Sequence, residues 1–179
     1  MIGRATLAVS LCWLCATAPV LAEEAAVLQL DSYGVYCKAE GPSTRLPAPG
    51  TVLGYVHITR TDTEATVVTT RVPATLGIAF GVALRAPADQ PDFNAEFRIT
   101  HPTATPGERI TERWVSHFSP QGPVLNQFRF EFPEELNTGL WVMEVYHADA
   151  RIFRQAFEVV APEAAGDILA QCSGFAPLS

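Results

Sequence analysis

The side chains that could carry chemistry in this chain are four histidines, scattered carboxylates and four cysteines. The most suggestive local arrangement is His147-Ala148-Asp149, in which an imidazole and a carboxylate stand two positions apart. Both are common metal ligands, so this pair could hold a metal ion if the fold supplied a third ligand. The same residues also suit a hairpin turn, because an Asp side chain can accept a hydrogen bond from the turn backbone. His147 and Asp149 are the candidate metal ligands, and a metal-binding protein or metal-dependent hydrolase is one alternative function.

The other histidines do not extend this site within the sequence. No two histidines stand at His-x-His or His-x-x-x-His spacing. His101 precedes Pro102 at the end of a predicted strand, and His117 alternates outward from Trp114 and Phe118. We therefore predict surface positions for both His101 and His117.

Motifs of enzymes are absent from the sequence. There is no Gly-x-Ser-x-Gly elbow and no Ser-x-x-Lys motif for nucleophilic catalysis. Phosphate-binding loops, dinucleotide-binding glycines and calcium loops of the Asp-x-Asp-x-Asp-Gly type are missing as well. The sequence predicts a protein that is not an enzyme and that has no cofactor.

The first residues have the pattern of a secretory signal peptide over residues 1–22. Arg4 precedes an apolar run that ends in Val20-Leu21-Ala22, a small-x-Ala cleavage signal. An uncleaved membrane anchor is the alternative, although Pro19 stands where an anchor would continue. Cleavage leaves a single domain over residues 23–179 with no membrane span, in the periplasm or secreted.

Cysteine usage agrees with export. Cleavage removes Cys12 and Cys15 and leaves Cys37 and Cys172. Two thiols in an oxidising compartment most simply form one disulfide, so we predict a Cys37–Cys172 bond. A free thiol or an intermolecular bond is the alternative for these two residues.

Charge limits the classes of partner. The formal net charge is −7 at pH 7. Nucleic acids and anionic lipids are bound by clustered basic side chains, so an acidic chain argues against both as partners. An unknown protein or a small ligand remains as the expected partner.

The elements that must position these side chains are strands, because the dominant hydrophobic period is two. Phe128–Phe132 places three aromatic side chains on one face, and Phe93–Ile99 alternates in the same way. Noisier predicted strands are Val27–Cys37, Val52–Arg60, Ala65–Val72, Ile110–Phe118, Leu140–His147 and Ile152–Val160. Eight or nine short strands predict an all-β fold, a single immunoglobulin-like antiparallel β-sandwich, with a small antiparallel barrel as the alternative.

The segment Leu76–Leu84 is predicted to form a strand with unequal faces. Large apolar residues fill one face, and the other carries only small residues: Gly77, Ala79, Gly81 and Ala83. A face of small residues lies close beneath something packed against it, which is either a neighbouring loop or a partner's strand. As a possible interaction strip, these residues support a second alternative function, a subunit of an envelope complex or a homo-oligomer.

Several segments together resemble a known family. They are Tyr33-Gly34-Val35-Tyr36, the stretch Val72–Gly81, His101-Pro102 and the C-terminal hairpin from Glu135 through Trp141 and Tyr146 to Val159. In these the chain resembles the bacterial family called domain of unknown function 3859, from about Tyr33 to Val160. The resemblance implies an exported immunoglobulin-like sandwich. It carries no catalytic residue over to this chain.

The sequence as a whole predicts a non-catalytic binding or accessory module of the cell envelope. Sandwich domains bind partners through end loops or an exposed strand edge. The loops at Gly41–Gly50, Arg85–Asp92 and Pro102–Glu108 are the candidate binding loops, and Gly139 and Trp141 are expected to serve the fold.

Overall fold

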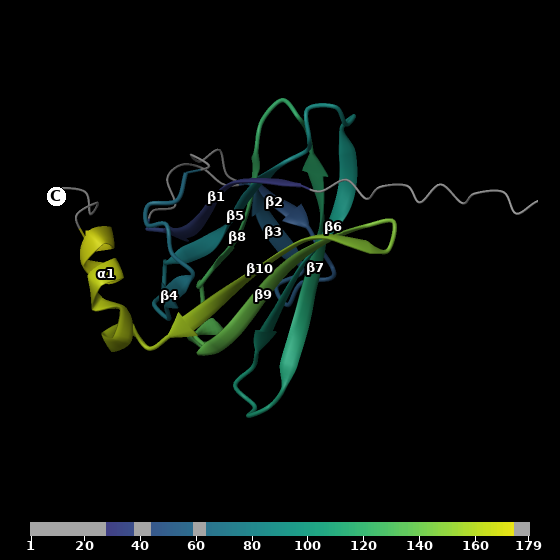
Figure 1. Ribbon diagram of the computed structural model, residues 1–179. Coiled ribbons are helices and arrows are strands. Elements are labelled where there is room, and N and C mark those ends of the chain that lie inside the picture. The colour runs from purple at the N-terminus through teal and green to yellow at the C-terminus, as the bar shows by residue number, and fades with distance from the viewer. Residues whose placement is uncertain (1–27, 38–43, 59–63, 174–179) are drawn as a thin grey trace, which may run out of the picture.

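The protein is described by a computed structural model that covers residues 28–37, 44–58 and 64–173 (Figure 1). The predicted signal peptide, residues 1–22, lies outside the described residues, as does the first part of the Gly41–Gly50 loop. Among the described residues, no helix has the length and apolar character needed to cross a membrane.

In the described part of the chain, ten strands form three sheets. Figure 1 shows their arrangement. The three-stranded sheet has the order β1-β5-β8, with β1 at Gln29–Tyr36, β5 at Ala79–Arg85 and β8 at Val124–Arg129. The five-stranded sheet has the order β4-β10-β9-β6-β7, with β4 at Arg71–Pro73, β10 at Ala150–Val160, β9 at Gly139–His147, β6 at Phe93–Pro102 and β7 at Arg109–Phe118. A two-stranded ribbon joins β2 at Thr44–Pro47 to β3 at Tyr55–Ile58. The helical elements are η1 at Pro133–Glu135, η2 at Pro162–Ala165 and α1 at Gly166–Ser173.

The connections between strands follow an immunoglobulin-like topology. The first strand, β1, pairs with β5 in one sheet, and β4 then crosses over to pair in parallel with the last strand, β10. All other paired strands are antiparallel. The order β10-β9-β6-β7 reproduces the larger sheet of such domains, and β1-β5-β8 reproduces the smaller one. The predicted immunoglobulin-like sandwich is confirmed, and separate open sheets exclude the barrel alternative.

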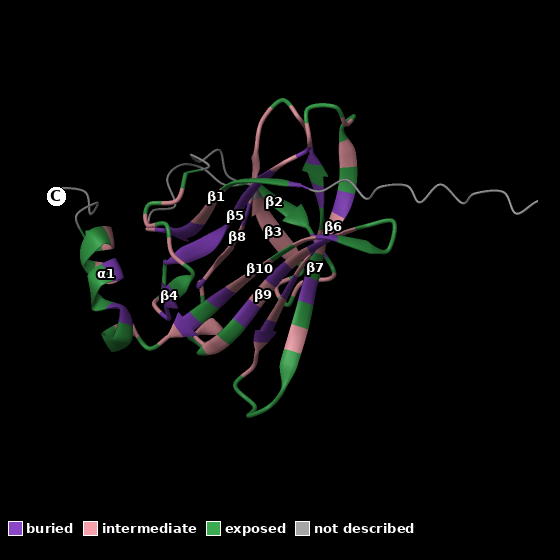
Figure 2. Ribbon diagram, viewed as in Figure 1, coloured by how far each residue is buried: buried purple, intermediate pink, exposed green. Residues whose placement is uncertain are grey.

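The core lies between the two main sheets, and its buried residues come from strands of both. These buried positions are purple on the ribbon in Figure 2. Trp141 on β9 is at its centre and packs against Phe80 of β5 at 5.5 Å and Phe130 at 5.7 Å between ring centroids. Along β6 the predicted alternation holds, with Phe97 and Ile99 fully buried. Burial of aromatic side chains of this size supplies most of the driving force that holds two sheets together.

Several predicted strands have different bounds in the structure. Only the first two residues of the predicted strand Phe128–Phe132 lie in a strand, because β8 starts at Val124 and stops at Arg129. Phe132, predicted to face inward, is 43% exposed, because the chain turns into η1 at Pro133. The predicted strand Ala65–Val72 is reduced to the three residues of β4, and the predicted Gly41–Gly50 loop contains β2.

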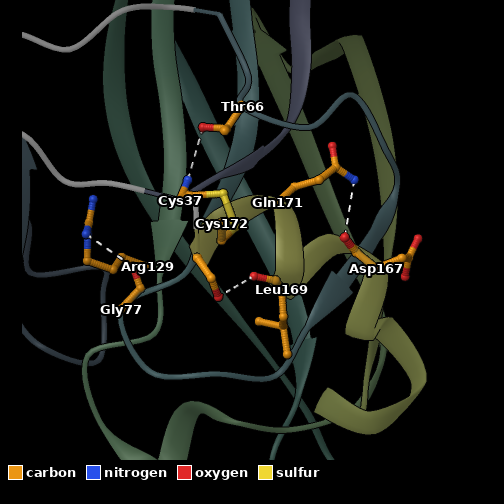
Figure 3. The surroundings of a disulfide bond; sticks show 9 residues. Cys37, Thr66, Gly77, Arg129, Asp167, Leu169, Gln171 and Cys172 are labelled. Carbon is orange, nitrogen blue, oxygen red and sulfur yellow. Dashed lines mark hydrogen bonds between the residues drawn. A yellow bond between two sulfur atoms is a disulfide. The ribbon is translucent and has the colours of Figure 1, made fainter. Parts of the chain in front are cut away.

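The disulfide joins Cys37, just after β1, to Cys172 in α1 (Figure 3). The Cys37 backbone N–H donates to the Thr66 hydroxyl at 3.2 Å, which ties the same point to the segment before β4. On the helix side, Ile168 is buried against the core, so α1 is held by packing as well as by the bond. The structure thus contains the bond that the cysteine count predicts.

Candidate functional site

An open depression of about 370 Å³ lies on the outer face of the five-stranded sheet, beside the turn between β9 and β10. Its walls come from β6, β7, β9 and that turn. They are formed by Asn94, Ala95, Glu96, Arg98, Val115, Tyr146, His147, Ala148 and Asp149. Concave sites with convergent polar groups are where small ligands and peptide side chains bind, so this depression is the candidate binding site.

Arg98 and Tyr146 form the centre of this face. Strand alternation points both side chains away from the core, and the register places Glu96 of β6 opposite Tyr146 of β9. The Arg98 guanidinium lies over the Tyr146 ring, 3.9 Å from its centroid, and forms an ion pair with Glu96. A hydrogen bond to Glu96 raises the pKa of Arg98 further above its usual value. The result is a fixed cation on an aromatic ring, an arrangement that can stack planar groups and pair with carboxylates.

His147 and Asp149 border the depression, and no third described residue joins them in a metal centre. Ala148 and Asp149 have φ angles of 46° and 65°, as a two-residue hairpin turn of type I′ requires. His147 packs edge-on against Phe93 at 4.8 Å, and its Nδ1 lies 3.2 Å from the Asn94 carbonyl oxygen. Among the described residues no group of three His, Cys, Asp or Glu side chains is arranged to hold a metal ion. The geometry therefore supports the hairpin-turn interpretation of this pair.

His117 lies on the same outer face, as its outward alternation predicts. Its Nδ1 is 3.1 Å from the Asn94 side-chain oxygen, and its Nε2 is 3.4 Å from Asp92. The His117 side chain is 60% exposed, so this pair contributes little to stability.

His101 is not a surface residue, and its predicted position is wrong. It is 4% exposed and lies flat on Trp141, with ring centroids 4.1 Å apart and planes 9° apart. The alternation that buries Phe97 and Ile99 simply continues for one more step to His101. Pro102 suggested that the strand ends in solvent, and β6 does end there. His101 is nevertheless inside, because its ring packs against Phe128 and Trp141.

His101 has a buried carboxylate partner, Glu112 of β7, which is 7% exposed. The His101 Nδ1 lies 2.9 Å from the Pro102 carbonyl oxygen, which can only accept, so Nδ1 carries a hydrogen. The Nε2 lies 3.1 Å from Glu112 Oε1, and this contact needs one more hydrogen, on the imidazole or on the carboxyl group. The pair thus holds a shared hydrogen in the core. Its burial makes it a structural element with no access for a substrate.

Glu112 also anchors the segment that leads into β3. Its second oxygen accepts a hydrogen bond from the Val52 N–H at 2.7 Å. The Gly50 carbonyl accepts a hydrogen bond from the Arg113 N–H at 2.9 Å, so the turn before β3 is fastened to β7 at two adjacent points. At the other end of the ribbon, His57 pairs with Glu131 at 3.0 Å.

The small-residue strip is not an exposed surface in this structure, which corrects its interpretation as an interaction strip. Ala79 and Ala83 are fully buried, and Gly81 is buried as well. A Cβ atom on Gly81 would lie 2.2 Å from the Asn126 carbonyl oxygen, so this glycine allows β8 to approach β5 closely. Gly77 lies outside the strand in an exposed turn with a φ of 83°. Nearby on β1, Tyr36 is buried, and this burial raises the pKa of its hydroxyl to about 12.

The profile of the family described as domain of unknown function (DUF3859) matches residues 24–159. The chain belongs to this family. Among solved structures, an immunoglobulin-like protein from Pseudomonas aeruginosa is 23% identical, with 71% of this chain and 97% of that chain covered and a TM-score of 0.44. A comparison with curated proteins gives no match.

In this DUF3859 protein, the ionisation of Glu135 should make the free energy of unfolding depend on pH. Burial raises the pKa of the Glu135 carboxyl, hydrogen bonds from the N–H groups of Phe132 and Glu131 oppose the rise, and the charges of Glu131 and Glu112 add to it. An acid whose pKa is raised in the folded state stabilises the fold below its unfolded pKa, and this stability is lost as the pH rises through the folded pKa.

We expect Glu135→Gln to relieve this loss, since the amide oxygen can still accept both backbone hydrogen bonds. The free energy of unfolding of Glu135→Gln, relative to the unsubstituted protein, should increase between about pH 4 and about pH 7. Chemical denaturation at several pH values measures it, with the exposed Glu134→Gln as the control. A constant difference across this pH range would contradict the prediction.

Proposed function

We propose that this protein is an exported, non-catalytic binding module of the cell envelope, periplasmic or secreted, that binds its partner on the outer face of the five-stranded sheet. The observation that carries the proposal is the depression centred on Arg98 and Tyr146. The disulfide supports the location, because such bonds form and persist in oxidising compartments. The resemblance of the first residues to a signal peptide supports export in the same way.

The character of the described side chains favours binding over catalysis. The buried imidazole–carboxylate pair of the described residues, His101 with Glu112, is enclosed in the core, where a substrate does not reach it. The pair of His117 with Asp92 near the depression is open to solvent, with more than half of each side chain exposed. A face that combines a guanidinium, an aromatic ring and a carboxylate is equipped for recognition.

Tyr146→Ala is the variant that tests the binding face. It removes the ring that holds Arg98 in place, so we expect the affinity for the native ligand to fall at least about tenfold. Leu140→Ala is the matched control, because Leu140 is an outward residue on the same strand, 49% exposed, and lies outside the depression.

Native mass spectrometry of protein purified gently from its own periplasm is the measurement. The mass of the unliganded chain should correspond to a start at Glu23 with one disulfide, which tests export. Additional bound mass should be present in the unsubstituted protein and in Leu140→Ala and absent in Tyr146→Ala. A bare chain in all three, or bound mass that Tyr146→Ala retains, would contradict the proposed face.

A further inference from the structure

The edge of the five-stranded sheet beside the depression is formed by β7. Its inner neighbour is β6, and the register pairs Arg98 with Arg113 and Glu96 with Val115. The Arg113 N–H donates away from β6, to the Gly50 carbonyl oxygen at 2.9 Å. In an antiparallel pair, alternate residues point their backbone groups to opposite sides, so Val115 and His117 also direct their N–H and C=O groups off the edge.

This part of the edge is uncovered in the described structure. Arg113 is capped by Gly50, but no described residue forms a backbone hydrogen bond with Val115 or His117 on that side. The edge of the other sheet differs, because Val35 of β1 exchanges two hydrogen bonds with Val67, at 2.9 and 3.1 Å. At the opposite edge of the larger sheet, β4 has only three residues. Exposed backbone groups on an edge strand are a template for a further strand.

The side chains on this edge specify what such a strand would carry. Val115 is 70% exposed and lines the depression. An apolar side chain placed next to it would be shielded from water by Val115 and by the wall of the depression. Arg113 points to the same outer face and forms no ion pair with a described residue, whereas its neighbour Arg98 is engaged by Glu96. A carboxylate on the added strand would pair with Arg113.

We propose that β7 accepts an extended peptide segment as a sixth strand, hydrogen-bonded to Val115 and His117, with an apolar side chain beside Val115 and a carboxylate beside Arg113. The partner is a protein with an exposed extended segment in which an apolar residue and an acidic residue stand two positions apart, because side chains two positions apart share one face of a strand. A second copy of this chain is a poorer occupant, since its β7 edge would bring the same cationic side chains, Arg109, Arg113 and His117, toward their equivalents. This inference rests on the proposed binding function and names its partner class.

The first experiment uses the disulfide-bonded protein and two capped synthetic peptides of about eight residues. In the Glu–Val peptide, Val and Glu alternate at every second position with Thr between them, so that both face the same side of the strand. In the Lys–Val peptide, Lys replaces Glu. NMR titration should show tighter binding of the Glu–Val peptide, by about tenfold or more. The amide protons of Val115 and His117 should exchange with solvent at least about tenfold more slowly in the complex. Equal binding of both peptides, or shifts confined to another part of the molecule, would overturn the proposal.

Two variants test the edge directly. Val115→Pro removes the outward N–H but breaks no hydrogen bond to β6, so an edge strand tolerates it. It should weaken binding of the Glu–Val peptide at least about tenfold. Val115→Thr keeps the N–H and the branched shape, so its affinity should stay within about twofold. Arg113→Glu should reverse the preference toward the Lys–Val peptide, and it tests the proposal even if Val115→Pro does not fold.

The remaining outcomes separate this inference from the binding function itself. If the native ligand is lost in Tyr146→Ala but bound equally by Val115→Pro and the unsubstituted protein, the depression binds a ligand and strand addition is wrong. If sedimentation shows a dimer that Val115→Pro converts to a monomer, the occupant of the edge is a second copy and the peptide proposal is overturned.

Discussion

Glu112→Ala is expected to lower the free energy of unfolding by about 3–5 kcal/mol, because it breaks a buried pair and leaves His101 Nε2 without a hydrogen-bond partner. The substitution removes the acceptor or donor at His101 Nε2 and also the acceptor for the Val52 N–H. The buried His101 and the part-buried Val52 N–H therefore lose their partners together, and the buried group carries most of the cost. Urea denaturation followed by tryptophan fluorescence measures the change.

Glu112→Gln separates the hydrogen bonds from the charge. Its amide can donate to Nε2 of a neutral His101 and can accept from Val52, so most of the stability should remain. Glu134→Ala is the control for removal of an exposed carboxylate and should change the free energy of unfolding by less than about 0.5 kcal/mol. The role assigned to Glu112 is wrong if its alanine variant is as stable as Glu134→Ala.

The His101–Glu112 pair also shows how far the sequence alone could lead. Alternation along Phe93–Ile99 extends to His101, and alternation from Trp114 and Phe118 extends to Glu112, so the inward position of each was available from its own strand. The contact between the two side chains could not be predicted in this way, because it depends on the register that pairs Ile99 with Glu112 and His101 with Ile110. A one-residue slip would have separated the two groups and placed one of them on the outer face.

Other differences also arise from contacts between distant segments. Periodicity identified the small residues of β5 correctly, but whether water or protein covers them depends on the packing of segments far away in the chain. The burial of Ala79 and Ala83 could therefore not be read from Leu76–Leu84 alone. Phe132 continued a clear aromatic alternation, yet Pro133 ends the extended run and starts η1, and that turn exposes it.

The candidate binding face was only partly predictable for the same reason. The outward positions of Glu96 and Arg98 follow from alternation on β6, and His147 with Asp149 follow from the hairpin. The depression itself requires β9 beside β6, and the open edge requires β7 to be the last strand of its sheet. Strand order is set by where the chain passes from one sheet to the other, as it does from β5 to β6 and from β8 to β9, and no local pattern encodes these crossings.

Removal of the Cys37–Cys172 bond is the second large effect that we expect. The bond closes a loop across 135 positions, and the chain-entropy model assigns such a loop about 5 kcal/mol of stabilisation. The double variant Cys37→Ser/Cys172→Ser should therefore unfold at a much lower guanidinium concentration than the oxidised protein. Because α1 lies beyond the region matched to the family, the sandwich should still form, with its buried strands protected from hydrogen exchange.

The comparison that isolates the bond uses the two single variants and the reduced unsubstituted protein. Each lacks the bond while differing by one or two side-chain atoms, so all should unfold at the same denaturant concentration as the double variant. Helix α1 retains the packing of Ile168, and its amides should become the least protected of the described elements once the bond is absent. Equal denaturation midpoints for the oxidised and reduced proteins would show that native packing, and not the closed loop, holds the two ends of the sandwich together.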